Sequence, residues 1–320
     1  MTGLIRFDKH LIRERHVLMG EYFVSLAGTE FGERLAFALA LISALAHSIF
    51  AALNKGGIDP YLNRGAINIA YCIMAAPFAL FILPFPTPFV LQLLLLSYIL
   101  HLGYEWLQAA AFSRGAFTLV YPIARGMGPL VTALFAIFLF SETLELSQWF
   151  GLLLLSGAVI SLGYVNLQEK DLSPELKAQL LPSILLAVGA GIGVALYTTV
   201  DAYGIREAFN PFTFLAWFFF LGGFGFPFVA YARYQKMIPK PPIKPLIKRG
   251  IIGAFIALFS FATLMLATRI GKVSEAAALR ETSIIFAAII GVVFFKEKLN
   301  KAKVLVIGLI ALGAIMIEFH

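Results

Sequence analysis

Ten apolar runs, each long enough to cross a lipid bilayer as a helix, constrain this chain more than any other feature of its sequence. A helix needs about 20 mostly apolar residues to span the hydrocarbon core, and a membrane β-barrel would show alternating segments of about 10 residues instead. Glycine, proline and charged residues separate the runs. The predicted spans are residues 34–55, 65–84, 88–112, 115–140, 146–166, 181–201, 211–232, 249–269, 272–295 and 302–319.

The composition also indicates an integral membrane protein. Of 320 residues, 60% are apolar and 13% are charged, whereas soluble domains carry roughly 25% charged residues. A net charge of +7 suits anionic lipid headgroups, so it requires no nucleic-acid partner. The single cysteine, Cys72, lies in an apolar run and cannot form an intramolecular disulfide. We therefore predict an all-α, polytopic membrane protein whose partner is the lipid bilayer.

The chain also contains an internal repeat. The polar connection at residues 168–179 separates five predicted spans from five. A shift of 155 positions places residues 114–144 on residues 269–299 without a gap, and it matches charged residues as well as apolar ones. The charged matches are Arg114 with Arg269, Arg125 with Arg280 and Glu142 with Glu297. Because five spans per half is an odd number, the second half enters the membrane inverted. Inverted repeats indicate alternating access around a midplane site.

Both repeated segments close on a similar signature. One reads Phe140-Ser141-Glu142-Thr143-Leu144 and the other Phe295-Lys296-Glu297-Lys298-Leu299. Glycines follow in each half, at Gly151, Gly157 and Gly163 and at Gly308 and Gly313. With these marks, residues 35–319 resemble the paired EamA-type domains of the drug/metabolite transporter superfamily. The family commonly has Gly-Glu at the closing turn, where this chain has Ser141-Glu142 and Lys296-Glu297.

The resemblance implies ten transmembrane helices in two inverted five-helix repeats, without a metal or organic cofactor. It implies transport of small polar metabolites such as amino acids, sugars or drugs, often outward. The predicted segments are a polar basic N-terminal tail at 1–33, a first EamA-like half at 34–167, a central linker at 168–180 and a second EamA-like half at 181–320.

Arginines inside the apolar runs are the main candidate functional residues. An ionisable side chain in a membrane span costs several kcal/mol and usually faces protein or a water-filled cavity. Arg125 in the fourth predicted span and Arg280 in the ninth both lie near the midplane if the repeats are inverted. Two guanidinium groups there would suit a carboxylate or phosphonate of a substrate. Alternatively, each arginine only pairs with a nearby carboxylate; the candidate partners are Glu105, Asp201, Glu275 and Glu281.

Two of these carboxylates, Glu105 and Glu281, are also candidate proton carriers, because burial away from water favours a protonated carboxyl group. Candidates for lining a substrate cavity are Tyr104, Tyr121 and Tyr197. Ordinary core packing is the alternative for these tyrosines.

Other polar residues and prolines in the spans have structural interpretations. His47 and His101 are expected to form interhelical hydrogen bonds. Pro122 and Pro129 predict an interruption of the fourth span, and such interruptions often flank transport sites.

The leading interpretation is a secondary transporter that exports an amino-acid-like or organic-anion substrate by alternating access. The alternatives are an uptake permease for a small organic anion such as a phosphonate, and a non-transporting membrane scaffold. The sequence has no HExxH, Cys/His cluster or GxxxxGK[ST] motif, so neither an enzyme nor a cofactor is expected. We expect a multi-pass protein of the cytoplasmic (inner) membrane, and a homodimer is left open.

The charges of the loops give two opposed predictions of orientation. The face opposite the termini carries more Lys and Arg, and residues 233–249 alone contribute six. Positive charge in short loops marks the cytoplasmic side, which predicts external termini. The resemblance and the basic tail favour cytoplasmic termini, because the charges before the first span usually dominate. We predict cytoplasmic termini.

Overall fold

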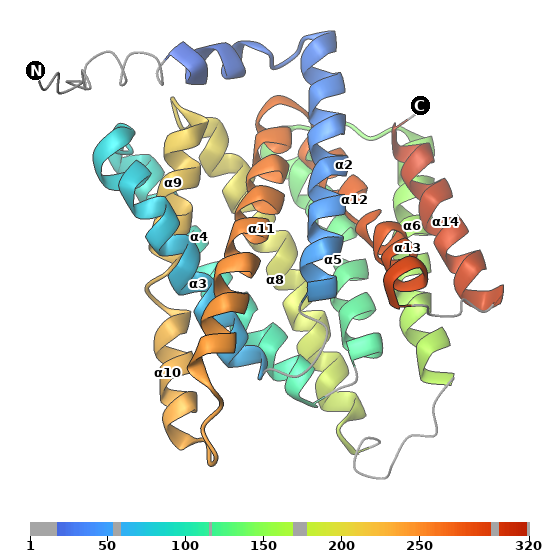
Figure 1. Cartoon of the computed structure of the whole chain (residues 1–320). Coiled ribbons are helices and arrows are strands. Elements are labelled where there is room, and N and C mark those ends of the chain that lie inside the picture. Colours follow the sequence, from blue (N-terminus) through green and yellow to red (C-terminus); the bar gives the residue numbers. More distant parts are fainter. Residues whose placement is uncertain (1–17, 54–58, 115–116, 169–177, 296–300, 319–320) are drawn as a thin grey trace, which may run out of the picture.

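The computed structural model describes residues 18–53, 59–114, 117–168, 178–295 and 301–318, and these residues form helices and the connections between them. The elements, labelled in Figure 1, are α2 Glu30–Leu53, α3 Pro60–Pro77, the π-helical turn η1 Phe78–Ile82, α4 Pro88–Arg114, α5 Phe117–Phe140, α6 Leu146–Gln168, α8 Leu180–Glu207, α9 Pro211–Gly222, α10 Phe226–Lys236, α11 Ile243–Ile270, α12 Val273–Arg280, α13 Ser283–Phe295 and α14 Lys301–Glu318.

Proline and a side-chain cap set the start of two helices. The Asp59 carboxylate accepts hydrogen bonds from the backbone N–H groups of Tyr61 and Leu62, at 3.0 and 3.3 Å, and Pro60 opens α3. Asn210 caps α9 in the same way, ahead of Pro211. Proline fits the first helical turn because its missing N–H would have no partner there.

Seven segments of the described residues are long and apolar enough to cross a membrane, by length and composition. They are Glu30–Phe50, Pro60–Ile82, Pro88–Arg114, Ile123–Phe140, Leu181–Glu207, Pro211–Lys236 and Ile243–Ile270, with shorter apolar helices at Leu146–Ser161 and Val304–Ile317. Large apolar side chains cover the outer faces, as at Phe81 and Phe138, which are 83% and 80% exposed. Such surface belongs in lipid rather than water. The prediction of an all-α, polytopic membrane protein is confirmed.

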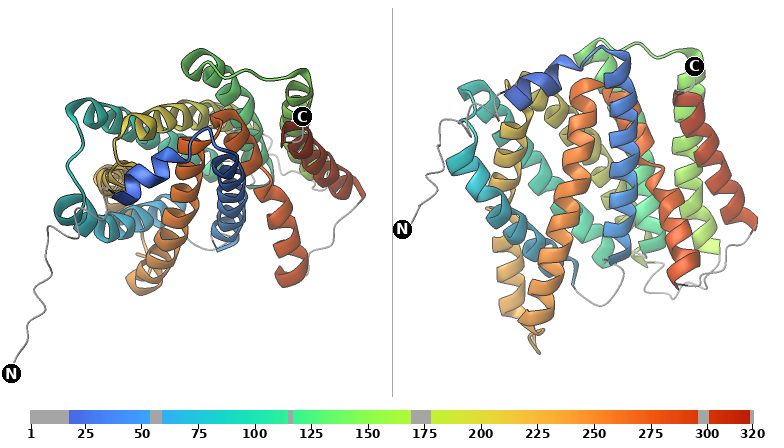
Figure 2. Two further views of the ribbon diagram at one scale, coloured as in Figure 1. Left: turned by 90° about the horizontal axis from the view of Figure 1, so that it is seen from above. Right: turned by 45° about the horizontal axis from the view of Figure 1, so that its top comes forward.

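Most of the large helix contacts join the first part of the chain to the second (Figure 1). α2 packs along α11, α4 along α8, and α6 along α14. α5 lies against α6 and α8, and α3 contacts α9, α10 and α11. Further views show α2 beside α11 and α6 beside α14 (Figure 2).

Glycine permits the close approach of α6 and α14. A Cβ atom at Gly151 would lie 2.7 Å from the carbonyl oxygen of Gly313, and a Cβ at Gly313 would lie 2.7 Å from that of Gly151. Because a real Cβ does not fit at that distance, the two backbones can meet only with glycine at both positions.

Two helical segments of the second half are interrupted. One break, at residues 223–225, separates α9 from α10, and the other, at Glu281 and Thr282, separates α12 from α13. The predicted interruption of the fourth span is wrong, because α5 runs unbroken from Phe117 to Phe140 through Pro122 and Pro129. Membrane helices tolerate proline where neighbouring groups compensate for the lost hydrogen bond.

Candidate functional site

The break between α12 and α13 places a charged pair, Arg280 and Glu281, in the interior of the helix bundle. Short backbone hydrogen bonds satisfy the break: the N–H of Glu281 donates to the Ala278 carbonyl and the N–H of Thr282 to the Leu279 carbonyl, both at 3.0 Å. The Thr282 hydroxyl also donates to the Leu279 carbonyl, at 2.7 Å. The interruption therefore leaves these amides paired without help from water.

Arg125 of α5 contacts Glu281 at two points, through the Nε and Nη2 edge of its guanidinium group. Nε donates to Oε2 at 3.0 Å, and Nη2 lies 2.8 Å from Oε1. Both side chains are buried. Glu281 is one of the four partners predicted for the arginines, and in the structure it pairs with Arg125. This two-point contact joins the two halves of the chain.

Arg280 has a different environment, although it is as deeply buried as Arg125, with 7% of its surface exposed. Its Nη2 lies 3.5 Å from Nδ1 of His47 on α2. Its Nε has no hydrogen-bond partner in the described structure, and no carboxylate of the described residues forms an ion pair with it. Arg280 is thus a buried cation without an ion-pair partner among the described residues, although it interacts electrostatically with the neighbouring Glu281.

A second polar cluster joins α3, α4 and α9. Glu105 accepts a 2.9 Å hydrogen bond from Asn68 and forms a 3.0 Å ion pair with Arg64. Asn68 and the hydroxyl of Tyr71 each donate to the carbonyl of Gly222, at 3.2 Å. That carbonyl lies at the end of α9, where the helix break leaves it without a helical partner. Glu105 therefore belongs to a network that supports the break.

Asp201 of α8 is fully buried and binds two side chains of α4. Its carboxylate accepts from the Ser97 hydroxyl and lies 2.8 Å from Nε2 of His101. The predicted interhelical hydrogen bonds of His101 and His47 are both confirmed. The ring of His101 lies 4.0 Å from that of Tyr197, which in turn lies 5.0 Å from the ring of Tyr104.

These groups share one polar interior. The charges of Arg125 and Arg280 act on both His47 and Tyr197. Arg64 likewise interacts electrostatically with Tyr104 and Tyr197. The structure therefore brings together seven of the nine candidate residues: Arg125, Arg280, Tyr104, Tyr197, Glu105, Glu281 and Asp201.

The other two candidates stand apart. Tyr121 lies in α5, but its side chain is outside the described part of the structure. Glu275 lies in the first turn of α12, where it accepts from Gln148 at 3.0 Å and pairs with Lys272 at 2.8 Å. Its partners therefore lie at the start of α12 rather than beside Arg280.

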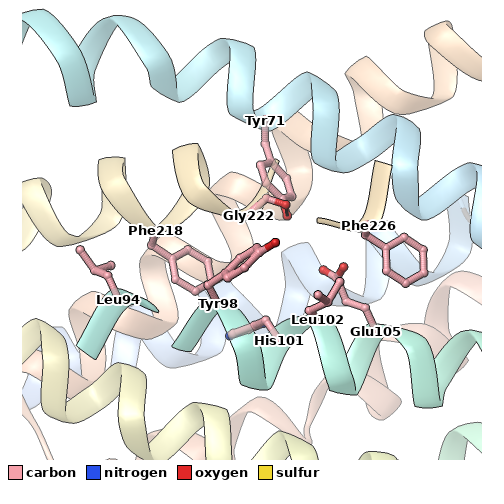
Figure 3. Close-up of a pocket in the computed structure, with 9 residues that line it drawn as sticks. All are labelled: Tyr71, Leu94, Tyr98, His101, Leu102, Glu105, Phe218, Gly222 and Phe226. Carbon is pink, nitrogen blue, oxygen red and sulfur yellow. Dashed lines mark hydrogen bonds between the residues drawn. The ribbon is translucent and has the colours of Figure 1, made fainter. Parts of the chain in front are cut away.

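A small cavity opens beside Glu105 and His101, between α3, α4, α9 and the start of α10 (Figure 3). Its volume is about 20 Å³, which is enough for roughly one water molecule. Its other lining residues are Tyr71, Leu94, Tyr98, Leu102, Phe218, Gly222 and Phe226. This cavity is too small for a metabolite in the observed conformation.

Three residues outside the predicted set also belong to polar clusters: Arg64, Asn68 and Glu142. Arg64 lies just before a predicted span, and Asn68 is uncharged, so neither gave the signal of a charge deep in a span. Glu142 was identified only as part of the closing signature. In the structure its carboxylate accepts from the backbone N–H groups of Val273 and Ser274, at 2.6 and 3.1 Å. Glu142 is thus a helix cap across the two halves, and its repeat mate Glu297 lies outside the described residues.

Comparisons with known proteins give a family and a fold. A solved structure titled "Crystal structure of protein" is similar to this chain with a TM-score of 0.65 and 17% identity, over 90% of this chain and 98% of its own. At that identity the likeness shows the fold alone. No curated protein matches the sequence.

The sequence model of the EamA-like transporter family matches residues 181–319, starting where the predicted second half begins. That match agrees with the resemblance inferred from the closing signature and the repeat. The proteins of this family are typically not enzymes. Residues 181–319 of this multi-pass membrane protein therefore form a domain of the EamA-like transporter family.

Proposed function

We propose that this protein is a secondary transporter that moves a small organic anion across the membrane by alternating access. The observation that carries the proposal is Arg280, a buried cation at a helix break that has no ion-pair partner among the described residues. An uncompensated buried charge costs several kcal/mol. A substrate anion would supply a counter-charge for Arg280, so its binding would be electrostatically favourable.

The chemistry of the site favours a carboxylate or phosphonate. A guanidinium group offers parallel N–H donors that match two oxygens of such groups. The N-terminus of α13, which begins at Ser283, adds the positive end of a helix dipole near the same point of the chain. Transporters often use interrupted helices in this way at midplane substrate sites.

The remaining candidates receive proposed roles from their positions. We assign Tyr104, Tyr197 and Tyr121 to the walls of the substrate path. Arg125 belongs to the same site but is held by Glu281, so we assign it to positioning. Glu281 and Glu105 are the proposed proton carriers. Asp201 and Glu275 are proposed as ion-pair and hydrogen-bond residues that hold helices together.

The helix contacts support an architecture of ten spans in two inverted five-helix repeats, with α12 and α13 together as the ninth span. The contact of α2 with α11 has its counterpart in that of α8 with α4, as expected when each first-half helix exchanges with its repeat mate. The contact of α6 with α14 maps onto itself under the same exchange. Alternating access would rock these repeats about the site between them.

Direction and orientation form a separate part of the proposal. The resemblance favours export from a cell across the inner membrane, and an uptake permease for a small organic anion is the alternative. We propose cytoplasmic termini. A cysteine placed at Lys240, with Cys72 replaced by alanine, should react with a membrane-impermeant thiol reagent in intact cells. If that cysteine reacts only after lysis, the loop is cytoplasmic and the termini are external.

The central experiment measures flux in vesicles that contain the purified protein. A panel of small carboxylates and phosphonates should include compounds that cross the membrane chemically unchanged and that raise the unfolding temperature by binding the folded state. Arg280→Gln should remove both effects. Arg34→Gln is the matched control, because Arg34 is exposed and, within the described part of the chain, pairs with Glu30, four residues away.

The proposal fails if Arg280→Gln protein carries these anions at the parent rate. If none of the compounds crosses the membrane, the result would favour a non-transporting membrane scaffold. An imposed pH gradient in the same vesicles tests coupling: Glu281→Gln or Glu105→Gln should remove its effect on flux, because an amide cannot carry the proton.

A further inference from the structure

The turn after α5 carries a buried glutamate, Glu142, that contacts the start of α12 in the other half of the chain. Glu142 accepts from the backbone N–H of Val273 at 2.6 Å, and from the N–H and hydroxyl of Ser274 at 3.1 and 2.5 Å. These N–H groups open α12, where they have no partner within the helix. A carboxylate there also complements the positive end of the helix.

An arginine of α8 completes the contact. Arg206 donates to the carbonyls of Thr268 and Gly271, at 2.9 and 2.7 Å, where α11 ends. Its guanidinium carbon lies 4.5 Å from the centre of the Phe140 ring, and its Nη2 is 3.8 Å from Oε1 of Glu142. Glu142, after α5, therefore binds the start of α12, and Arg206 of α8 binds the end of α11.

The backbone conformation of Ser141 sets the direction of Glu142. Ser141 has a φ of 54°, in the left-handed region that L-residues other than glycine, asparagine and aspartate rarely enter. This turn reverses the chain directly after α5, so that Glu142 points back towards α12. The surrounding contacts hold a backbone conformation that would be unfavourable in isolation.

We infer that Glu142 and Arg206 form a clamp that closes this end of the transport path and positions Arg280 through α12. The clamp holds the first residues of α12, and Arg280 is the last of its eight residues. A short helix moves as a unit, so releasing its first turn would also displace Arg280. The closure itself does not depend on the substrate, whereas the positioning of Arg280 rests on the proposed function.

The location of the clamp gives it the role of a gate. It lies at the end of the molecule where α2 begins and α14 ends (Figure 1), and it joins the two proposed repeats. Alternating access requires contacts of this kind to break when that end opens. Release is feasible because water can replace the lost partners of a carboxylate and of helix N–H groups.

A cysteine at Ser274 would report on the clamp directly. In a Cys72→Ala background, Ser274→Cys places a thiol at a side chain that is 3% exposed beside Glu142. We expect slow reaction of this thiol with a soluble maleimide. Adding Glu142→Gln should raise the reaction rate about tenfold, the effect of losing roughly one charge-assisted hydrogen bond. Adding Glu145→Gln, an exposed position three residues on, should leave the rate unchanged.

A second variant covers the case in which Glu142→Gln does not fold. Arg206→Lys keeps Glu142 but loses the planar fork that reaches two carbonyls, so it should raise the same labelling rate by a smaller factor. Equal labelling rates in the parent and in a folded clamp variant would overturn the clamp. The labelling experiment needs no substrate. If the clamp variants label faster but the protein carries no organic anion, the proposed function is wrong and the clamp is still supported.

Positioning of Arg280 has its own readout. In Glu142→Gln, organic anions that stabilise the parent should raise the unfolding temperature less, with Glu142→Asp intermediate because it retains the charge. Faster labelling with undiminished anion stabilisation would show a gate that does not position Arg280, which contradicts that half of the inference.

Discussion

The helices α5 and α12–α13 occupy the same register of the sequence repeat but differ in structure. α5 is unbroken although it contains two prolines, whereas its mate breaks at Glu281 and Thr282 without any proline. Arg125 of α5 has a two-point carboxylate partner, whereas the hydrogen-bond contact of Arg280 within the described residues is with a histidine, at 3.5 Å. Equal positions in a repeat therefore carry unequal electrostatic environments.

The difference follows from the residue after each arginine. Glu281 follows Arg280 and reaches across to Arg125, whereas Gly126 follows Arg125 and offers Arg280 no carboxylate. A side chain at position 126 would also be crowded, since a Cβ there would lie 2.6 Å from Ile160. A change at a single repeat position thus gives one arginine in a two-point ion pair and one arginine without an ion-pair partner among the described residues.

The largest expected effect comes from removing the carboxylate that neutralises Arg125. Glu281→Ala should lower the unfolding free energy by about 3–5 kcal/mol, because it leaves a buried charge without its partner. Thermal unfolding of detergent-solubilised protein measures the loss. The double variant Arg125→Met with Glu281→Leu should recover most of that stability, since it removes both charges. A double variant no more stable than Glu281→Ala would argue that packing, and not charge, dominates here.

The two arginines themselves should respond differently to the same substitution. Arg125→Gln should destabilise the protein by a few kcal/mol, because it orphans Glu281. Arg280→Gln should leave stability unchanged or raise it, because it removes a charge without an ion-pair partner among the described residues. Unfolding temperatures of the two variants test this contrast. Equal losses would show that Arg280 is also compensated in the folded protein.

Where Gly151 of α6 and Gly313 of α14 face each other, the two halves should behave symmetrically. Gly151→Ala and Gly313→Ala should each cost about 1–3 kcal/mol, because each added methyl group meets the carbonyl of the opposite glycine. Gly157→Ala in the same helix has nothing within 4 Å of the added Cβ and serves as the control. Clearly unequal costs at positions 151 and 313 would contradict the reciprocal contact.

The smallest expected effect concerns the turn that aims Glu142. Ser141→Gly should stabilise the protein by roughly 0.5–1 kcal/mol, because glycine adopts positive φ without steric cost. It would also restore the Gly-Glu pair that is common in the family at this turn. A modest rise in unfolding temperature is the expected result, and Ser141→Ala should show none. A fall with glycine would mean that the serine side chain matters more than the backbone strain.

Much of the fold was predictable because the signals are local. Apolar runs of spanning length, breaker residues between them and a charged repeat register can all be read without knowing any contact. The candidate set was also largely predictable, since an ionisable group inside a span must face the protein interior. Seven of nine candidates do share one polar region.

The tertiary structure alone decided which charges meet. The sequence offered four carboxylates for two arginines, and only helix packing selects Glu281 for Arg125, Arg64 for Glu105 and His101 for Asp201. It also placed the break at Glu281 and Thr282 instead of at the prolines of α5. Hydropathy and proline content are properties of single segments, whereas pairing and helix interruption depend on what neighbouring helices present to them.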